Sequence, residues 1–146
     1  KLGLLNTKFS LVGPHVAAAI PMSMMLIRNA MDEISDEMIE ASIIDGCPRR
    51  KVFTKMMLPL TKPAIATALI FAFMSSWNDY LLPLVMINRA DEMTLTLLPQ
   101  KFTAFAGVSN VGTIFASLVL LCVPIFIIYL FAQKYMVAGM AAGTIK

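Results

Sequence analysis

The chain has 146 residues, of which 58% are hydrophobic and only 14% are charged, and its formal net charge at pH 7 is +3. This composition excludes an ordinary soluble domain of the same length and predicts that a lipid bilayer is the solvent. The positive charge does not indicate nucleic-acid binding, because the basic residues lie beside apolar runs and do not alternate with aromatic residues on a polar surface.

The first predicted membrane span covers residues 9–27, which carry no formal charge and lie between Lys8 and Arg28. A bilayer core about 30 Å thick requires roughly 20 apolar residues of helix, because a helix satisfies all of its own backbone polar groups. The long side chains of Lys8 and Arg28 can extend to the two interfaces. His15, the single histidine, lies inside this span, and we expect it to hydrogen-bond a group on another helix.

The polar stretch 28–62 is predicted to form two short helices joined at Gly46. Ser35 is the expected N-cap of the first helix, and Asp36 and Glu37 would lie in its first turn, where carboxylates favour the positive end of the helix dipole. Gly46 suits the left-handed residue that ends a helix, and Pro48 suits the first position of the next one. The sequence therefore predicts a helix, a glycine turn and a second helix.

The second of these helices is predicted over residues 49–57. Leu58-Pro59 is expected to end it, because proline disfavours helical geometry in the residue before it, and Pro63 would begin the following span. Exposed charges, with Ile39, Ile43 and Ile44 on other faces, favour docking into a groove on a soluble partner. The alternative is a solvated connecting loop whose apolar positions face the bilayer surface.

The second and third predicted spans cover residues 64–87 and 113–132. Neither shows the alternating pattern of a membrane β-barrel, so the fold class is predicted as an all-α membrane protein. Asp79 is an acid inside the second span, and such residues commonly face a water-filled cavity or a polar partner. Its neighbours complete a candidate solute pathway of Trp77, Asn78, Asp79 and Tyr80. The alternative is structural packing in an aromatic belt at the outer interface.

Topology follows from the distribution of basic residues. Residues 28–62 hold six lysines and arginines, whereas residues 88–112 hold Arg89 and Lys101. The more basic loop is expected on the cytoplasmic side, so the residue-1 end would lie outside and the C-terminal tail inside. Lys1 and Lys8 oppose this assignment. The chain begins without Met and without a signal-peptide layout, and we expect it to be a piece of a longer protein.

Two cysteines, Cys47 and Cys122, lie far apart in the chain, one in the polar stretch and one in an apolar run. Neither a disulfide framework nor a metal cluster is therefore indicated. We expect both to serve as small packing residues.

The polar stretch resembles the cytoplasmic loop of permease subunits in binding-protein-dependent ABC importers, whose pattern is Glu-Ala-Ala, three residues, Gly, nine residues, Ile, one residue and Leu-Pro. The positions in register are Glu40, Ala41, Gly46, Leu58 and Pro59. Ser42 stands for the second Ala and Met56 for the Ile, and Asp45 fits the form common in the carbohydrate-importing branch.

Three further segments resemble permeases of the maltose and glycerol-phosphate type: residues 2–7, residues 76–80 and residues 133–143. The resemblance covers nearly the whole chain. It implies the C-terminal half of a six-span subunit, a transmembrane domain of the type I ABC importer class, in the plasma (inner) membrane of a bacterium or archaeon.

By this resemblance the subunit is a transport component and no enzyme, with neither catalytic residues nor a cofactor or metal. Its partners would be two ATPase subunits, a second permease and an external solute-binding protein, and its solute a carbohydrate. No Gly-rich phosphate-binding loop with Gly-Lys-Ser/Thr occurs in the sequence. The ATPase-coupling residues implied are Glu40, Ala41, Ser42, Asp45, Gly46, Leu58 and Pro59.

Two alternatives remain open at this stage. A subunit of an ion-coupled carrier or channel would use Asp79 and His15 as its ionic residues, but it would not need the paired helices around Gly46. An ABC importer for glycerol phosphate or another small polar solute is the other. The spans show no arginine cluster for a phosphate group, which argues modestly against the phosphate ester.

Overall fold

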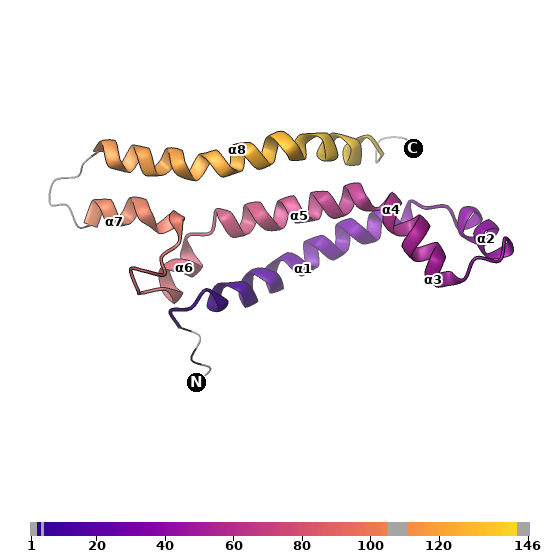
Figure 1. The fold of residues 1–146 in the computed structure, drawn as a ribbon, viewed down its shortest axis with the longest axis horizontal. Coiled ribbons are helices and arrows are strands. Elements are labelled where there is room, and N and C mark those ends of the chain that lie inside the picture. The colour runs from indigo at the N-terminus through magenta and orange to yellow at the C-terminus, as the bar shows by residue number, and fades with distance from the viewer. Residues whose placement is uncertain (1–2, 4, 105–110, 143–146) are drawn as a thin grey trace. The chain divides into compact units, whose positions relative to one another are not determined.

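The structure is a computed structural model that describes residues 3, 5–104 and 111–142, and all the regular secondary structure in these ranges is helical (Figure 1). This confirms the all-α prediction. In chain order the helices are α1 (Phe9–Asp32), α2 (Asp36–Ile44), α3 (Arg49–Val52), the π-helix η1 (Phe53–Met57), α4 (Leu58–Leu60), α5 (Lys62–Trp77), α6 (Leu81–Met86), the 3₁₀-helix η2 (Leu95–Leu97), α7 (Leu98–Ala104) and α8 (Val111–Ala142).

Two compact units make up the chain. One comprises Lys1–Ala19 and Ala72–Phe131, and the other comprises Ile20–Phe71 and Ala132–Lys146. The bounds of α1, α5 and α8 show that each of these helices belongs partly to both units. The first unit holds Asp79 and its neighbours, and the second holds the paired helices around Gly46.

Among the described residues, two helices are long and apolar enough to cross a membrane, Phe9–Asp32 and Val111–Gln133. The pair Arg49–Leu60 and Lys62–Trp77, bent by 63°, would supply a third span only if it crosses as one broken helix. The buried apolar side chains among the described residues are few: Val52, Ala68, Ile87, Leu97 and Ala132. Most apolar surface of these helices is therefore left for lipid or for further protein.

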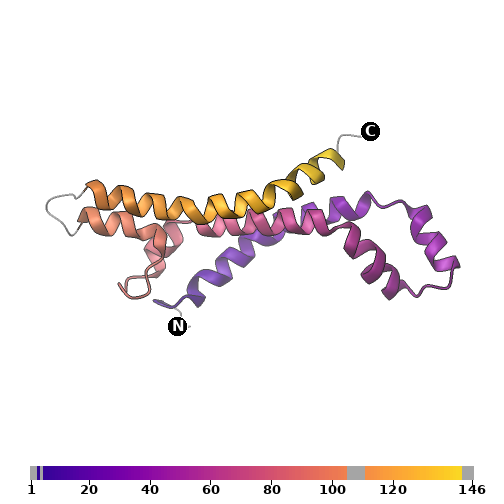
Figure 2. The same cartoon turned by 45° about the horizontal axis from the view of Figure 1, so that its top comes forward.

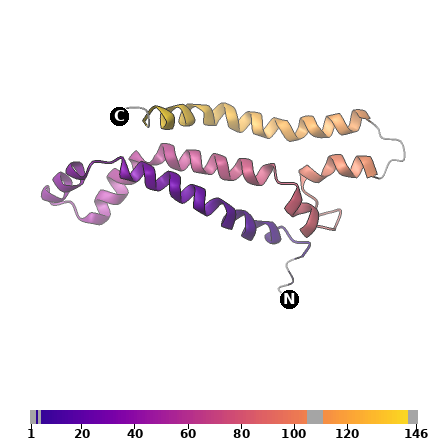
Figure 3. The same ribbon diagram turned by 180° about the vertical axis from the view of Figure 1, so that it is seen from behind.

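The expected single helix over residues 64–87 is corrected by the structure. α5 ends at Trp77, and α6 begins separately at Leu81 (Figure 3). The cause is the side chain of Asp79, whose Oδ1 accepts the backbone N–H groups of Leu81 at 3.1 Å and Leu82 at 3.4 Å. Aspartate favours such local bonds over continued helix, so it starts α6 and interrupts the segment.

The first of the paired helices agrees with the sequence in its ends. Ser35 occupies the N-cap of α2 with extended backbone, and Asp36 and Glu37 lie in the first turn. The Ser35 hydroxyl makes no capping hydrogen bond. Its carbonyl oxygen instead accepts the N–H groups of Met38 at 3.1 Å and Ile39 at 3.4 Å.

The turn at Gly46 is a Schellman motif. Gly46 has a φ of +81°, as the sequence predicts. The N–H of Gly46 donates to Ile43 O at 3.0 Å, and the N–H of Cys47 donates to Ser42 O at 3.1 Å. These are the two bonds that close a helix C-terminus around a left-handed residue, and they satisfy carbonyl groups that α2 would leave unpaired.

The second helix begins at Arg49, as the sequence predicts, but it differs from the prediction at its C-terminal end. Pro48 is the N-cap of α3 and not its first residue. Leu58-Pro59 does not end the helix, because the chain continues from α3 through η1 into α4 and stays helical to Leu60 (Figure 2). Pro59 is the second residue after the wider turn of the π-helix Phe53–Met57. The wider turn relieves the clash between a proline ring and the preceding carbonyl group.

The break before α5 lies at Thr61. This residue is fully buried, at 0% exposure, and its N–H donates to Met57 O at 3.0 Å. Its hydroxyl donates to Leu58 O at 3.1 Å. Lys62 and Pro63 then begin α5, where a proline costs no hydrogen bond. Thr61 thus forms the joint at which the 63° bend occurs.

Candidate functional site

The first candidate site is the elbow, residues 36–60, formed by α2, the Gly46 turn, α3, η1 and α4. None of the residues of α2 is buried. Apolar side chains are exposed as well, with Ile44 at 84%, Met38 at 47% and Phe53 at 44%. A segment that exposes both its charges and several large apolar side chains is suited to a protein contact.

The expected coupling residues lie in two parts of the elbow. Glu40, Ala41 and Asp45 are exposed on α2 and its C-terminal end, and Leu58 and Pro59 are exposed in α4. A Cβ added to Gly46 would meet nothing within 4 Å. Within this chain glycine is therefore required there for its positive φ and not for a close contact.

Ser42 and Met56 connect the two arms of the elbow. The Ser42 hydroxyl lies 2.9 Å from Met38 O and 3.3 Å from the sulfur of Met56, both within hydrogen-bonding reach. These are the two positions at which the chain departs from the permease pattern in the sequence. The departures thus contact one another, a relation that the spacing alone does not reveal.

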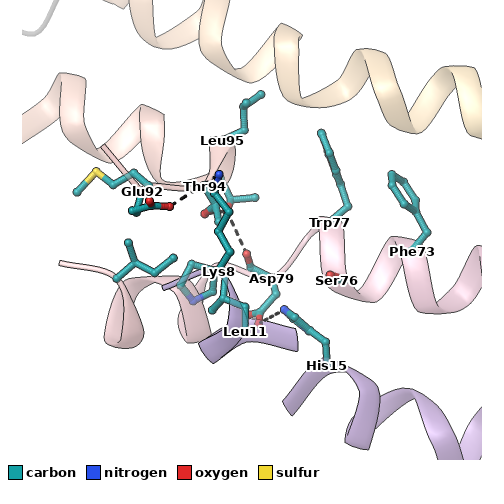
Figure 4. A pocket seen from close by; sticks show the side chains of 14 residues that line it. Lys8, Leu11, His15, Phe73, Ser76, Trp77, Asp79, Glu92, Thr94 and Leu95 are labelled. Atoms are coloured by element: carbon teal, nitrogen blue, oxygen red, sulfur yellow. Dashed lines mark hydrogen bonds and ion pairs between the residues drawn. The ribbon is translucent and has the colours of Figure 1, made fainter. Parts of the chain in front are cut away.

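The second candidate site surrounds Asp79. Its Oδ1 begins α6, and its Oδ2 lies 3.6 Å from Nε2 of His15 on α1. Its carbonyl oxygen accepts the hydroxyl of Thr96 at 3.1 Å. Figure 4 shows His15 directed toward Asp79 from a separate helix, with a dashed line between the two side chains. Both oxygens of the carboxylate and the backbone carbonyl thus hold parts of the first unit together.

His15 lies beside a polar group outside its own helix, but the 3.6 Å contact is longer than a hydrogen bond and Asp79 lies between α5 and α6, so this contact is not the expected hydrogen bond to another helix. The side chains of His15 and Asp79 are 20% and 24% exposed. The pair was not predicted as such, because the two residues are 64 positions apart. The only signal in the sequence was that each is a lone polar residue in an apolar run.

A cavity of about 410 Å³ lies beside Asp79. Its polar lining includes Lys8, His15, Ser76, Asp79, Glu92, Thr94 and Thr96. Oε2 of Glu92 is buried without a hydrogen-bond partner and lies 3.8 Å from Nζ of Lys8. The sequence analysis missed the contribution of Lys8, Glu92 and the two threonines, because nothing in their local sequence sets them apart.

The expected solute-pathway residues are only partly brought together. Trp77 and Asp79 line the 410 Å³ cavity, and Trp77 donates from Nε1 to Leu121 O at 3.2 Å and stacks on Phe73 with ring centroids 5.5 Å apart. Asn78 lines a separate hollow with His15 and Asp79. The Tyr80 hydroxyl donates to Gln100 at 2.6 Å and lines neither. Asp79 therefore shares one hollow with Trp77 and another with Asn78, whereas Tyr80 lines neither of the two.

Within the described part of the chain, no three His, Cys, Asp or Glu side chains gather as a metal site would need. Cys47 and Cys122 are both exposed free thiols. The expectation that they serve as packing residues within the chain is therefore not supported.

Comparison with known proteins identifies permease components of transport systems as relatives of this chain. A family model described as the inner membrane component of binding-protein-dependent transport systems matches residues 3–142. The arabinooligosaccharides transport system permease protein AraQ of Halalkalibacterium halodurans is 34% identical over 147 residues, which is 100% of this chain and 51% of AraQ.

Two further relatives show the same coverage. The diacetylchitobiose uptake system permease protein NgcG of Streptomyces coelicolor is 31% identical over 148 residues, or 99% of this chain and 48% of NgcG. The maltodextrin transport system permease protein MdxG of Bacillus subtilis is 30% identical over 145 residues, or 99% of this chain and 52% of MdxG. The chain thus spans about half the length of the curated relatives it matches.

Proposed function

Because the chain belongs to the family of inner membrane components of binding-protein-dependent transport systems, we propose that it is the C-terminal half of a permease subunit that imports a carbohydrate. The subunit pairs with a second permease and receives the solute from an external binding protein. Energy comes from two separate ATPase subunits, and the permease itself makes or breaks no covalent bond. Relatives named for arabino-oligosaccharides, diacetylchitobiose and maltodextrin support the solute class.

The elbow is the observation that carries this proposal. Transport requires that ATP-driven closure of the ATPase subunits shift the permease between two states, and only different contacts in the two states can do so. The elbow offers exposed charges and apolar side chains on arms joined by a hydrogen-bonded turn. The coupling residues proposed are Glu40, Ala41, Ser42, Asp45, Gly46, Leu58 and Pro59.

The bend at Thr61 supports a mechanical role for the elbow. Backbone hydrogen bonds run through η1 and α4 to Thr61, whose N–H and hydroxyl both bond to the preceding turn. Force applied to the elbow would therefore reach α5 through a bonded helical path and not through a flexible linker. We place the elbow on the cytoplasmic side of the inner membrane, with the residue-1 end outside.

For the solute pathway we propose Trp77 and Asp79, which line one cavity, in preference to Asn78 and Tyr80. An indole ring can stack on the apolar face of a sugar, and Glu92 adds a buried carboxylate oxygen without a hydrogen-bond donor. The ion-coupled carrier receives less support. The N–H groups of α6 and His15 hold the carboxylate of Asp79 in place at the cavity wall, which leaves it less suited to bind and release a coupling ion.

The test replaces Glu40 by Ala in the full-length subunit and measures assembly with the ATPase, ATP hydrolysis and solute uptake. We expect membrane insertion to persist while uptake and ATPase assembly fall together. Arg89→Ala is the matched control, because Arg89 pairs with Asp91 at the exposed surface, where 62% and 60% of the two side chains are accessible. Unchanged ATP-coupled uptake in Glu40→Ala, with the control also unchanged, would contradict the proposed function.

A further inference from the structure

The charges of the elbow change sign at Gly46. Before the turn, residues 32–45 include acidic residues but no Lys or Arg. After the turn, residues 49–62 include basic residues but no Asp or Glu. Within the elbow the acids are Asp36, Glu37, Glu40 and Asp45, and the bases are Arg49, Arg50, Lys51 and Lys55. Four of each sign give a net charge of zero, so the separation is invisible in the total.

These charges do not neutralise one another. All eight side chains are exposed. The ion pairs found in the described part of the chain are Lys8–Glu92, Arg28–Asp32 and Arg89–Asp91, and neither these pairs nor the contact of His15 with Asp79 joins the two arms. The side-chain hydrogen bond found between the arms is that of Ser42 and Met56. The charged side chains of the two arms are therefore exposed and form no ion pair with each other, so they are available to another surface.

We infer that the elbow docks between two surfaces of opposite sign on the ATPase subunit, a basic surface that faces α2 and an acidic surface that faces α3 and η1. This inference rests on the proposed function and specifies the chemistry of the partner. The exposed Ile44 and Phe53 supply an apolar centre, and the charges form the rim, which is the usual anatomy of a protein interface.

Charge separation of this kind fixes orientation. An elbow inserted the wrong way round would place like charges against like on both sides, and their repulsion would disfavour that orientation. Correct insertion also speeds association, and both effects weaken as salt screens the charges. The elbow is therefore a polarised connector that enters its groove in one direction.

The competing explanation is that the basic arm binds anionic lipid headgroups. Lys and Arg near a membrane surface are attracted to such lipids. The acidic arm, however, is joined to the basic arm by the short turn at Gly46 and Cys47, and the same surface would repel it. A protein groove with two walls accommodates both arms, and for this reason we favour it.

The test uses the full-length permease reconstituted with its ATPase, and measures ATPase binding against salt concentration. One variant reverses the acidic arm (Glu37→Lys with Glu40→Lys), one reverses the basic arm (Arg50→Glu with Lys51→Glu), and a third combines all four changes. Neutral versions with Gln at the same positions serve as milder variants, and Lys101→Glu is the control outside the elbow.

We expect each reversed arm to weaken ATPase binding at low salt by about tenfold or more, and the combined variant to bind most weakly although its net charge is unchanged. The neutral variants should bind less tightly at low salt and converge with the parent near 1 M salt, where the screening length is about 3 Å. A misfolded elbow would bind weakly at every salt concentration, so this convergence separates the two causes.

Three outcomes would overturn the inference. Parent-like ATPase binding of the combined variant would show that the sign of the charge on each arm does not determine binding. Either attraction between the two arms or no charge at all would then be the relevant factor. Loss for the basic-arm variant only in membranes with anionic lipid would assign that arm to the bilayer. Tight ATPase binding that ignores all these changes would refute the polarised connector but leave the proposed function standing. Failure of the parent elbow to contact any ATPase would refute the proposed function itself.

Discussion

The elbow and the surroundings of Asp79 are built in opposite ways. In the elbow the backbone sets the shape, through the Schellman turn at Gly46 and the helical path to Thr61, and the charged side chains stay exposed. Around Asp79 a side chain sets the shape, because one carboxylate begins α6 and pairs with His15. Side chains that are free of internal partners are available for another molecule, whereas side chains with such partners hold the chain together.

This contrast predicts different effects for substitutions in the two regions. Changes to exposed side chains of the elbow should alter binding and transport with little effect on stability, whereas changes at Asp79 should alter stability first. Backbone changes in the elbow are the exception, because the turn itself presents the exposed groups.

The largest effect is expected at Gly46. Gly46→Val places a β-branched residue at a φ of +81°, and left-handed geometry costs an ordinary residue about 1–2 kcal/mol. We expect the Schellman turn to open and ATP-coupled uptake to fall by about tenfold. Gly46→Asn is the matched control, because asparagine tolerates this geometry and a Cβ there meets nothing within 4 Å. Equal loss in both variants would show that close approach of a partner, and not φ, requires the glycine.

The next effect is expected at Asp79. Asp79→Ala removes the acceptor for the N–H groups of Leu81 and Leu82, and loss of a capping side chain costs about 0.5–2 kcal/mol. Asp79→Asn keeps an oxygen acceptor and should retain most of the stability. Thermal unfolding of the purified subunit measures the difference. If Asn proves as damaging as Ala, the charge opposite His15 matters more than the cap.

A smaller effect is expected at Thr61. Thr61→Val keeps the shape but deletes the hydroxyl that donates to Leu58 O, and a net intramolecular hydrogen bond contributes about 1 kcal/mol. Thr61→Ser keeps the hydroxyl and is the control. We expect Val, and not Ser, to lower the ratio of solute transported to ATP hydrolysed. Loss in Ser alone would contradict a role for the hydroxyl in stiffening the joint.

The smallest effect is expected for Ser42 and Met56, and it needs a double-mutant cycle. Ser42→Ala and Met56→Ile each replace one partner of the 3.3 Å contact by the residue of the permease pattern. We expect each single change to weaken ATPase binding slightly and the double change to restore it, with a coupling of about 0.5 kcal/mol. Additive losses would show that the two side chains do not cooperate.

Local features of the elbow could be predicted from the sequence, and contacts across the chain could not. Gly46 and the first turn of α2 can be predicted because their residue types have backbone preferences that act within a few positions. The passage of the helix through Pro59 could not be foreseen, because it depends on the π-helical turn before it. Asp79 was a local indication that residues 64–87 form two helices. The apolar residues on either side of it nevertheless favoured the prediction of one continuous span.

Two contacts across the chain could not be predicted from the sequence: the pairing of His15 with Asp79 and the contact of Ser42 with Met56. Each depends on how separate segments pack, and one sequence without related sequences contains no information about such pairs. The sequence proposes Trp77, Asn78, Asp79 and Tyr80 as a solute pathway because an acid lies inside an apolar run. Of these, Trp77 and Asp79 line the cavity, together with groups from two other segments.

The most direct test of the account uses Cys47, an exposed thiol beside Gly46. In the full-length subunit, with Cys122→Ala and every other cysteine replaced, Cys47 would carry a short photoactivatable crosslinker in the assembled complex. The account predicts that Cys47 reacts only with reagents supplied from the cytoplasmic side, that the crosslink joins it to the ATPase subunit, and that its yield changes when ATP binds. Labelling from the exterior, or crosslinks to lipid alone, would contradict it.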